Sequence, residues 1–164
     1  MSANNRVFPG MTGVYSRGAL TATGAETVHD TTVSIHYSIG GKMYIKTAIT
    51  DGVTPTTDHN TAAAFTGLTG TTTSGQACVF VWGLNSSGDV KVCQGPVVST
   101  DASGNIEDPG LFFPAVKDDI APFAYMVSKH YGTASTWTFG SSNWNATGFN
   151  NTIVNVAQLP DRPV

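Results

Sequence analysis

The stretch at residues 76–95, QACVFVWGLNSSGDVKVCQG, constrains the fold more strongly than any other part of the chain. An apolar, β-prone run (VFVW) is followed by turn-forming residues (NSSGD) and then by a second extended pattern (VKVC). This order predicts a β-hairpin. If Gly88 takes the left-handed conformation, which glycine adopts at little cost, the loop comprises residues 86–88 and Asn85 faces Asp89.

The two arms of this hairpin carry different patterns. In the first arm Val79 and Val81 alternate with Phe80 and Trp82, so both faces are apolar. Such a strand is typical of the interior of a sandwich or barrel. In the second arm Val90 and Val92 alternate with Lys91, which predicts that one face of this strand is more exposed to solvent.

The two cysteines fall in the same hairpin. In the predicted register Cys93 faces Val81, whereas Cys78 lies near the base, so the two sulfur atoms are not opposite each other. We therefore expect free thiols rather than a disulfide.

A second hairpin is predicted at residues 32–49, TVSIHYSI-GG-KMYIKTAI. A two-residue glycine turn would place Lys46 opposite Ile35 and so mix charge into an apolar face. Shifting the register by one residue, with Ile39 opposite Met43, gathers the apolar side chains on one face. That face would hold Val33, Ile35, Tyr37, Ile39, Met43, Ile45 and Ile49. Because a one-residue slip inverts every side chain, we expect burial to decide and the loop to have three residues.

The rest of the chain alternates short β-prone runs with Gly, Asn and Pro turns. The expected strands are Val97–Thr100, Phe123–Lys129, Trp137–Phe139 and Ile153–Val156. Residues 111–121 contain aromatic side chains between prolines and predict an ordered connection. The only expected helix is a single turn at 60–65, capped by Asn60. The pattern predicts an all-β fold, a single antiparallel β-sandwich or β-barrel domain.

The first thirty residues lack sustained periodicity. We divide the chain into an extended N-terminal segment, residues 1–30, and a β-sandwich or β-barrel domain, residues 31–164. Two interpretations of the N-terminal segment stay open. It is either an edge strand plus loop lying on the domain, or an arm that docks on a neighbouring subunit.

Charge and composition narrow the classes of partner. The formal net charge is −3, and the eight Lys and Arg residues form no basic run. This argues against nucleic acid, because neutralising phosphates takes clustered cations. Charged residues make up only 12% of the chain, a composition that suits extracellular, fibrous or virion β-proteins. We see no signal-peptide core or membrane span, and expect synthesis in a cytoplasm, a soluble product and no membrane partner.

No pattern of residues points strongly to catalysis or to a metal. The chain lacks the G-x-S-x-G, Walker, Rossmann, C-x-x-C and H-E-x-x-H motifs. The adjacent pairs Asp58-His59 and Asp118-Asp119 are weak acid-base candidates. The alternating oxygen ligands at 101–107 imitate a calcium loop, but lack the bidentate Glu at position twelve and favour a hairpin turn. We expect no enzyme, no cofactor and no bound metal.

Aromatic residues concentrate near the C-terminus in WTFGSSNWNATGF. Trp137, Trp144 and Phe149 are separated there by small polar residues. They either pack in the core and its turns, or form an exposed patch that binds a partner, since interface centres are enriched in aromatic residues.

Several blocks taken together carry a family resemblance. They are AAAFTGL, CVFVWGLNSSGDVKVCQG, APFAYMVSK, WTFGSSNWNATG and the ending QLPDRP. From about residue 54 to the end, this order resembles small head and structural proteins of tailed bacteriophages, in particular capsid decoration, or cement, proteins. The blocks contain no catalytic motif, so the resemblance concerns kinship more than mechanism.

The resemblance implies a structural virion protein on the capsid exterior. Such a protein would reinforce the expanded shell by binding neighbouring copies of the major capsid protein. It would also form a homo-oligomer, with a trimer favoured over a dimer. The candidate interface residues are Phe8, Met11, Tyr15, Trp137, Trp144 and Phe149. The alternative is a phage tail or fibre module that binds host surface glycan through exposed Trp and Tyr faces.

Overall fold

The computed structural model describes residues 10–107 and 110–163 and confirms the all-β prediction. No helix occurs in these residues, whose strands form four antiparallel sheets. The sheets do not close into a barrel anywhere in the described ranges. The predicted helical turn at 60–65 is wrong. Asp58, not Asn60, caps a turn there by accepting hydrogen bonds from the main-chain N–H groups of Asn60 and Thr61.

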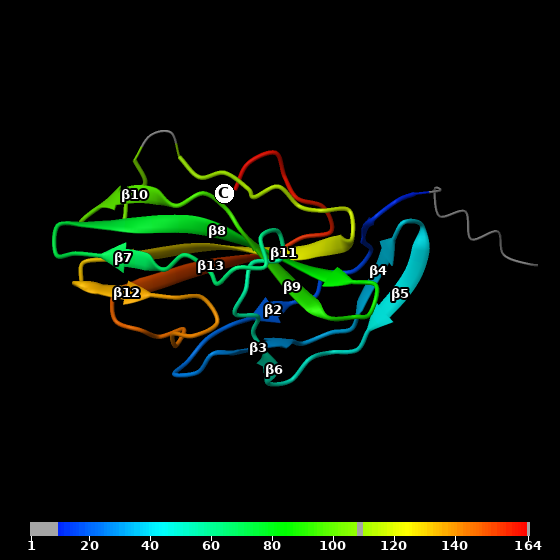
Figure 1. Cartoon of the computed structure of the whole chain (residues 1–164). Coiled ribbons are helices and arrows are strands. Elements are labelled where there is room, and N and C mark those ends of the chain that lie inside the picture. The colour runs from blue at the N-terminus through cyan, green and yellow to red at the C-terminus, as the bar shows by residue number, and fades with distance from the viewer. Residues whose placement is uncertain (1–9, 108–109, 164) are drawn as a thin grey trace, which may run out of the picture.

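The largest sheet has five strands in the order β10-β8-β11-β13, with β9 paired to β8 (Figure 1). Its strands are β8 Ser74–Asn85, β9 Val90–Gln94, β10 Val98–Asp101, β11 Ile120–Tyr131 and β13 Phe149–Asn155. Strands β8 and β11 have 12 residues each and pair along nearly their whole length. These two strands organise the domain.

Three smaller sheets surround this central sheet. They comprise β1 Gly13–Val14, β4 Ile35–Ile39 and β5 Lys42–Lys46; β2 Leu20–Thr21, β3 Val28–Thr31 and β6 Gly52–Val53; and β7 Leu68–Gly70 with β12 Ser135–Trp137. The β4–β5 hairpin lies at one end of the molecule, at the right of Figure 1, and β7 and β12 lie at the other. From Gly10 onward the N-terminal segment lies on the domain, where β1 pairs with β4 and Leu20 is buried. Residues 1–9 of the segment lie outside the described residues, so the choice between its two interpretations stays open.

Strand β8 separates two hydrophobic cores, as its doubly apolar pattern predicts. Phe80 and Trp82 face the larger core and contact Phe139, with ring centroids 4.2 and 5.2 Å away. Val79 and Val81 face the smaller core on the other side of the sheet. Both faces of this strand are therefore covered.

The connection before β11 covers the smaller core. Leu111, Phe113 and Val116 pack against it, and the Phe113 ring meets Tyr125 edge to face at 5.0 Å. Residues 111–119 form no strand, which confirms the prediction of an ordered connection anchored by aromatic side chains for that part. The predicted end at residue 121 is wrong, because β11 begins at Ile120 and pairs with β8 from there.

The β8–β9 hairpin has the predicted loop. Gly88 has a φ of 80°, and the main-chain N–H of Asn85 donates to the carbonyl of Asp89 at 3.1 Å. Cys93 pairs with Val81, and both cysteines are free thiols, as expected. Burial raises the pKa of each thiol to about 12, so neither is a reactive nucleophile at neutral pH.

The β4–β5 hairpin contradicts the predicted three-residue loop. Ile39 pairs with Lys42, and only Gly40 and Gly41 form the turn, with φ values of 55° and 84°. Two successive left-handed residues define the type I′ turn, whose twist matches that of the strands. The predicted apolar face is wrong because Met43 pairs with Ser38 and points to the outer face of the sheet, opposite to Ile35 and Tyr37.

Candidate protein-interaction surface

The outer face of the β1–β4–β5 sheet exposes a group of large apolar side chains. We call it the apolar face. Its members are Met11, 44% exposed, Tyr15, 46%, Met43, 41%, and Ile45, 65%. The register brings them together, because Met43 pairs with Ser38 and Ile45 with His36 on β4, while the segment around β1 runs along the other side of β4. An exposed apolar cluster of this kind marks interaction sites on soluble proteins.

Partly buried polar contacts hold the apolar face in place. The Oη of Tyr15 lies 2.8 Å from Oγ of Ser38. The Ser38 hydroxyl donates to the main-chain carbonyl of Met11 at 2.9 Å. The same carbonyl accepts the main-chain N–H of Gly41 at 2.9 Å. These bonds tie the segment that leads into β1 to the β4–β5 turn, so the exposed side chains stand on a defined surface.

The inner face of this sheet is used for folding. Ile35 and Tyr37 are fully buried there, and the Tyr37 hydroxyl donates to the carbonyl of Asn85 at 2.9 Å. The hairpin is thus anchored over the β8–β9 turn. Only its inner face takes part in the core, and no described residue covers the exposed side chains of the apolar face.

Two of the six predicted interface residues belong to the apolar face. Met11 and Tyr15 are half-exposed there, and Phe8 lies outside the described residues. Sequence reasoning missed Met43 and Ile45 because the wrong hairpin register placed them in the core. The GG pair between the two strands was the signal that could have found them.

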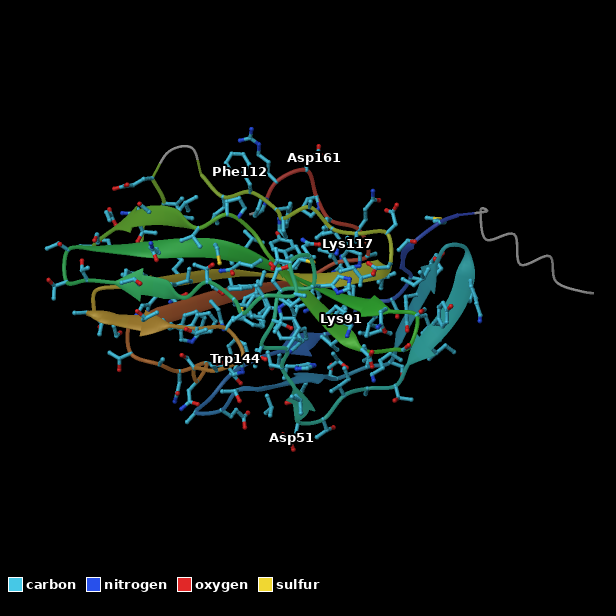
Figure 2. The ribbon with its side chains drawn as sticks, viewed as in Figure 1. Asp51, Lys91, Phe112, Lys117, Trp144 and Asp161 are labelled. Carbon is cyan, nitrogen blue, oxygen red and sulfur yellow. The ribbon has the colours of Figure 1, made fainter. Side chains whose placement is uncertain are left out.

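The three C-terminal candidates lie elsewhere. Trp137 is 1% and Trp144 is 4% exposed, and Phe149 is partly buried and stacks on Trp137 with centroids 3.8 Å apart. The indole N–H of Trp137 donates to the main-chain carbonyl of Asn143, and that of Trp144 donates to the carbonyl of Val28. The expectation of an exposed aromatic patch is therefore wrong, and core packing, the other alternative, is what the structure has. Figure 2 labels Trp144 on the segment between β12 and β13, away from the two ends of the molecule.

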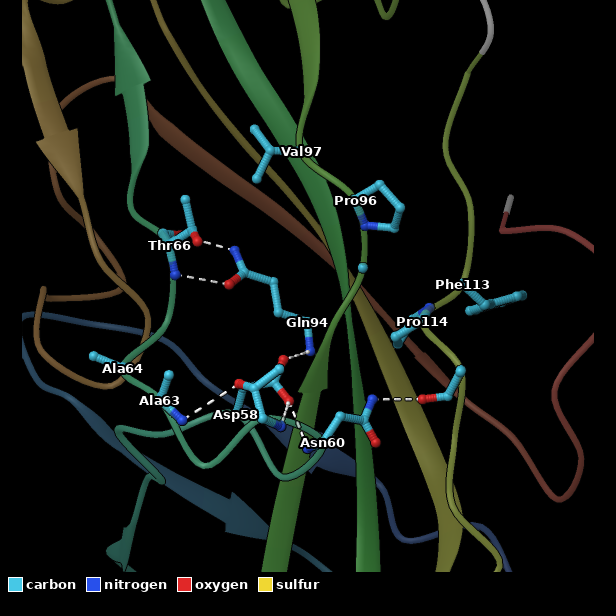
Figure 3. A pocket seen from close by; sticks show the side chains of 13 residues that line it. Asp58, Asn60, Ala63, Ala64, Thr66, Gln94, Pro96, Val97, Phe113 and Pro114 are labelled. Carbon is cyan, nitrogen blue, oxygen red and sulfur yellow. Dashed lines mark hydrogen bonds between the residues drawn. The ribbon is translucent and has the colours of Figure 1, made fainter.

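A groove of about 630 Å³, lined by both polar and apolar side chains, lies beside the Asp58 turn (Figure 3). The Asp58 carboxylate also accepts the main-chain N–H of Gln94 at 3.0 Å, and the Gln94 amide exchanges two hydrogen bonds with the Thr66 main chain, each 2.8 Å long. The amide of Asn60 donates to the carbonyl of Ala115. These hydrogen bonds hold neighbouring segments together, so most of the polar atoms serve the fold, while Oδ1 of Asn60 is buried without a hydrogen-bond partner among the described residues.

His59 pairs with Asp119, not with its neighbour Asp58. Its Nε2 lies 3.0 Å from Oδ1 of Asp119, and this hydrogen bond is the main reason why the pKa of the Asp119 carboxyl is lowered. Lys117 donates to the carbonyls of His59 and Asn60 nearby. The cluster joins the Asp58 turn to the segment before β11, and Asp118 contributes its main-chain carbonyl to Thr12.

The calcium-like sequence at 101–107 forms the hairpin turn that was favoured. Gly104 has a φ of 77°, and Asp101 accepts hydrogen bonds from the side chain and main chain of Asn105. These bonds lower the pKa of Asp101. The described residues contain no group of three His, Cys, Asp or Glu side chains placed to hold a metal ion. No helix that could cross a bilayer occurs in the part of the chain that the structure covers.

Comparison of the chain with protein-family models, with curated proteins and with solved structures found no match.

Proposed function

We propose that this protein is a structural binding module that decorates the outside of a tailed-phage capsid by contacting neighbouring major capsid protein subunits. The observation that supports a binding role is the apolar face, where Met11, Tyr15, Met43 and Ile45 are exposed together on one sheet. The phage setting comes from the resemblance of the sequence blocks.

The chemistry of the apolar face suits repeated, modest contacts. Its side chains are uncharged, so binding through them loses little to salt screening. A stable two-protein interface buries about 800 Å² per partner, more than four partly exposed side chains supply. Many copies on a shell overcome this limit through multivalency.

The glycan-binding alternative depends on exposed tryptophan and tyrosine faces. All three tryptophans of the chain, Trp82, Trp137 and Trp144, are buried in the larger core, whereas Tyr15 is 46% exposed on the apolar face. Tyr15 lies there beside Met11 and Met43, and a surface that combines tyrosine with methionine is typical of contacts with a protein partner.

Electron microscopy of purified virions tests the proposal by locating this chain. We expect it on the outside of the head, and a position on the tail would overturn the proposal. Co-sedimentation with expanded heads that lack the protein gives a second measure. Wild-type protein should bind them, and a variant with Met43→Ser and Ile45→Ser should bind about tenfold more weakly.

Two matched variants complete this test. Val53→Ser removes an exposed apolar side chain, 86% accessible, from β6 in a different sheet, and should bind heads like wild type. Deletion of residues 1–9 tests whether Phe8 takes part in binding without removing buried Val14 or Leu20. Equal binding by all variants would remove the apolar face from the proposal.

A further inference from the structure

We propose that the open edge of β5 is a strand-addition site for an extended segment of a partner protein in which apolar and acidic residues alternate. This inference rests on the proposed function in one respect, that the occupant is a protein chain. It adds the chemistry and the geometry of the segment that binds.

The edge of β5 is free in the described structure. Strand β5 ends the order β1-β4-β5 and pairs only with β4. A two-residue turn closes on a hydrogen-bonded pair, here Ile39 and Lys42, and the pairs then alternate along the hairpin. The main-chain groups of Met43 and Ile45 therefore point away from β4, toward the open edge. An unpaired edge of this kind is a template for another strand.

The side chains of β5 define what the added strand should carry. Residues directly opposite each other on paired strands share a face. A partner residue opposite Met43 or Ile45 would extend the apolar face and cover it. Partner residues opposite Lys42 and Lys46 would lie on the other face, beside two ammonium groups.

Charge specifies the partner further. The chain has a formal net charge of −3, yet this five-residue strand carries two lysines. Lys42 and Lys46 form no ion pair with any described residue, and Lys42 Nζ lies 5.4 Å from the centroid of the Tyr44 ring. Carboxylates on the added strand would pair with both lysines. The recognised pattern is thus acidic, apolar, any residue, apolar, acidic.

The same lysines disfavour a second copy of β5 as the occupant. Antiparallel pairing of two β5 strands, centred on Tyr44, would set Lys42 of each copy opposite Lys46 of the other. Like charges directly opposite each other destabilise a strand pair, and lysine on an edge strand is a common guard against self-pairing.

A peptide titration tests the inference with the full chain. The probe is a capped peptide centred on Glu-Val-Thr-Val-Glu, and its control has Lys in place of both Glu residues. Amide chemical shifts report binding. We expect the acidic peptide to shift the Met43 and Ile45 amides and to bind about tenfold more tightly than the basic peptide, because two cross-strand charge pairs change sign.

Two variants make the test decisive. Ile45→Pro removes an N–H that β4 does not use, so a folded variant should lose peptide binding. Lys42→Glu with Lys46→Glu should reverse the preference, so that the basic peptide binds more tightly. Val53→Thr, on β6, should change neither result.

Several outcomes would overturn the inference. These are equal binding of the two peptides, shifts confined to another sheet edge, no binding of either peptide, or concentration-dependent shifts of β5 that show self-association. Head binding separates this failure from failure of the proposed function. If folded Ile45→Pro binds heads like wild type, the strand-addition inference fails and the decoration proposal stands. If wild-type protein binds the acidic peptide but does not bind heads, the decoration proposal fails and the strand-addition inference stands.

Discussion

The β8–β9 and β4–β5 hairpins are both rich in apolar residues, but they use them differently. Both faces of β8 are covered, and Trp82 and Val81 are fully buried. In β4–β5 the described residues cover the inner face of β4 but leave much of the outer face of the hairpin open, and Ile45 is 65% exposed. Apolar side chains in a strand therefore show that it can be buried, whereas the elements that reach each face decide whether it is.

The turns of the two hairpins explain why one register was predicted and the other was not. At Gly88 the turn and the burial pattern demand the same pairing. At Gly40 and Gly41 the two-residue turn and the apolar pattern demand different registers. The structure has the register of the type I′ turn, with φ values of 55° and 84°. Burial does not oppose this register, because none of the residues that the structure describes covers the exposed side chains of the apolar face.

The largest effect should come from truncating the covered strand. Trp82→Ala removes a fully buried side chain that contacts Phe139 and Trp144. The cavity and the lost apolar burial should lower the free energy of unfolding by about 3–5 kcal/mol, measured by urea denaturation. Phe112→Ala, at a 40% exposed site, is the control and should cost less than about 1 kcal/mol. Similar losses in both would mean that β8 is not the core strand.

The junction of the two hairpins should make stability depend on pH. His29 is buried edge-on against Trp82, and it lines a small cavity with Lys46 of β5 and Gly88 of the β8–β9 turn. Desolvation lowers its pKa from 6.5 to about 4. Above pH 6.5 the imidazole is neutral in both states. As the pH falls toward 4, only the unfolded chain gains the proton, so stability should drop by about 3 kcal/mol.

Unfolding free energies measured between pH 7 and pH 4 check this expectation. His29→Gln should flatten the profile across that window, whereas His36→Gln, at an exposed position, should keep the wild-type slope. A His29→Gln profile as steep as that of wild type would assign the pH dependence to other groups.

A smaller loss should follow from removing the glycine turn of the β4–β5 hairpin. Replacing both Gly40 and Gly41 with Ala forces two side chains into left-handed conformations, at a cost of roughly 2–4 kcal/mol in total. Gly88→Ala, with one such position, should cost about half as much. Gly13→Ala, which meets no atom within 4 Å and needs no positive φ, should be close to neutral. Thermal denaturation compares the three, and a neutral double variant would show that the turn does not set the register.

The smallest effect should come from the apolar face itself. Ile45→Thr keeps a β-branched side chain on a strand and should change the free energy of unfolding by less than about 0.5 kcal/mol. The same change of chemistry at a buried site, Val81→Thr, should cost about 1–3 kcal/mol, because a hydroxyl loses water there. Chemical denaturation of both variants checks the contrast. A large loss from Ile45→Thr would mean that this chain already covers the apolar face.

Part of the candidate surface could be predicted from the sequence. Met11 and Tyr15 stood out as apolar residues in a segment without a core of its own, and both are half-exposed. Met43 and Ile45 could not be found once the register was wrong. Trp137 and Trp144 are as aromatic as any interface residue, and composition alone could not place them in the core.

The sequence by itself determined the all-β class, the β8–β9 hairpin and the turn at Asp101, because turn dihedrals and strand alternation depend on a few neighbouring residues. Tertiary structure decided which apolar faces are covered and which distant groups meet, such as His59 and Asp119, 60 positions apart. Burial and pairing of this kind depend on which distant segments of the chain pack against a surface, and a short sequence pattern does not contain that information.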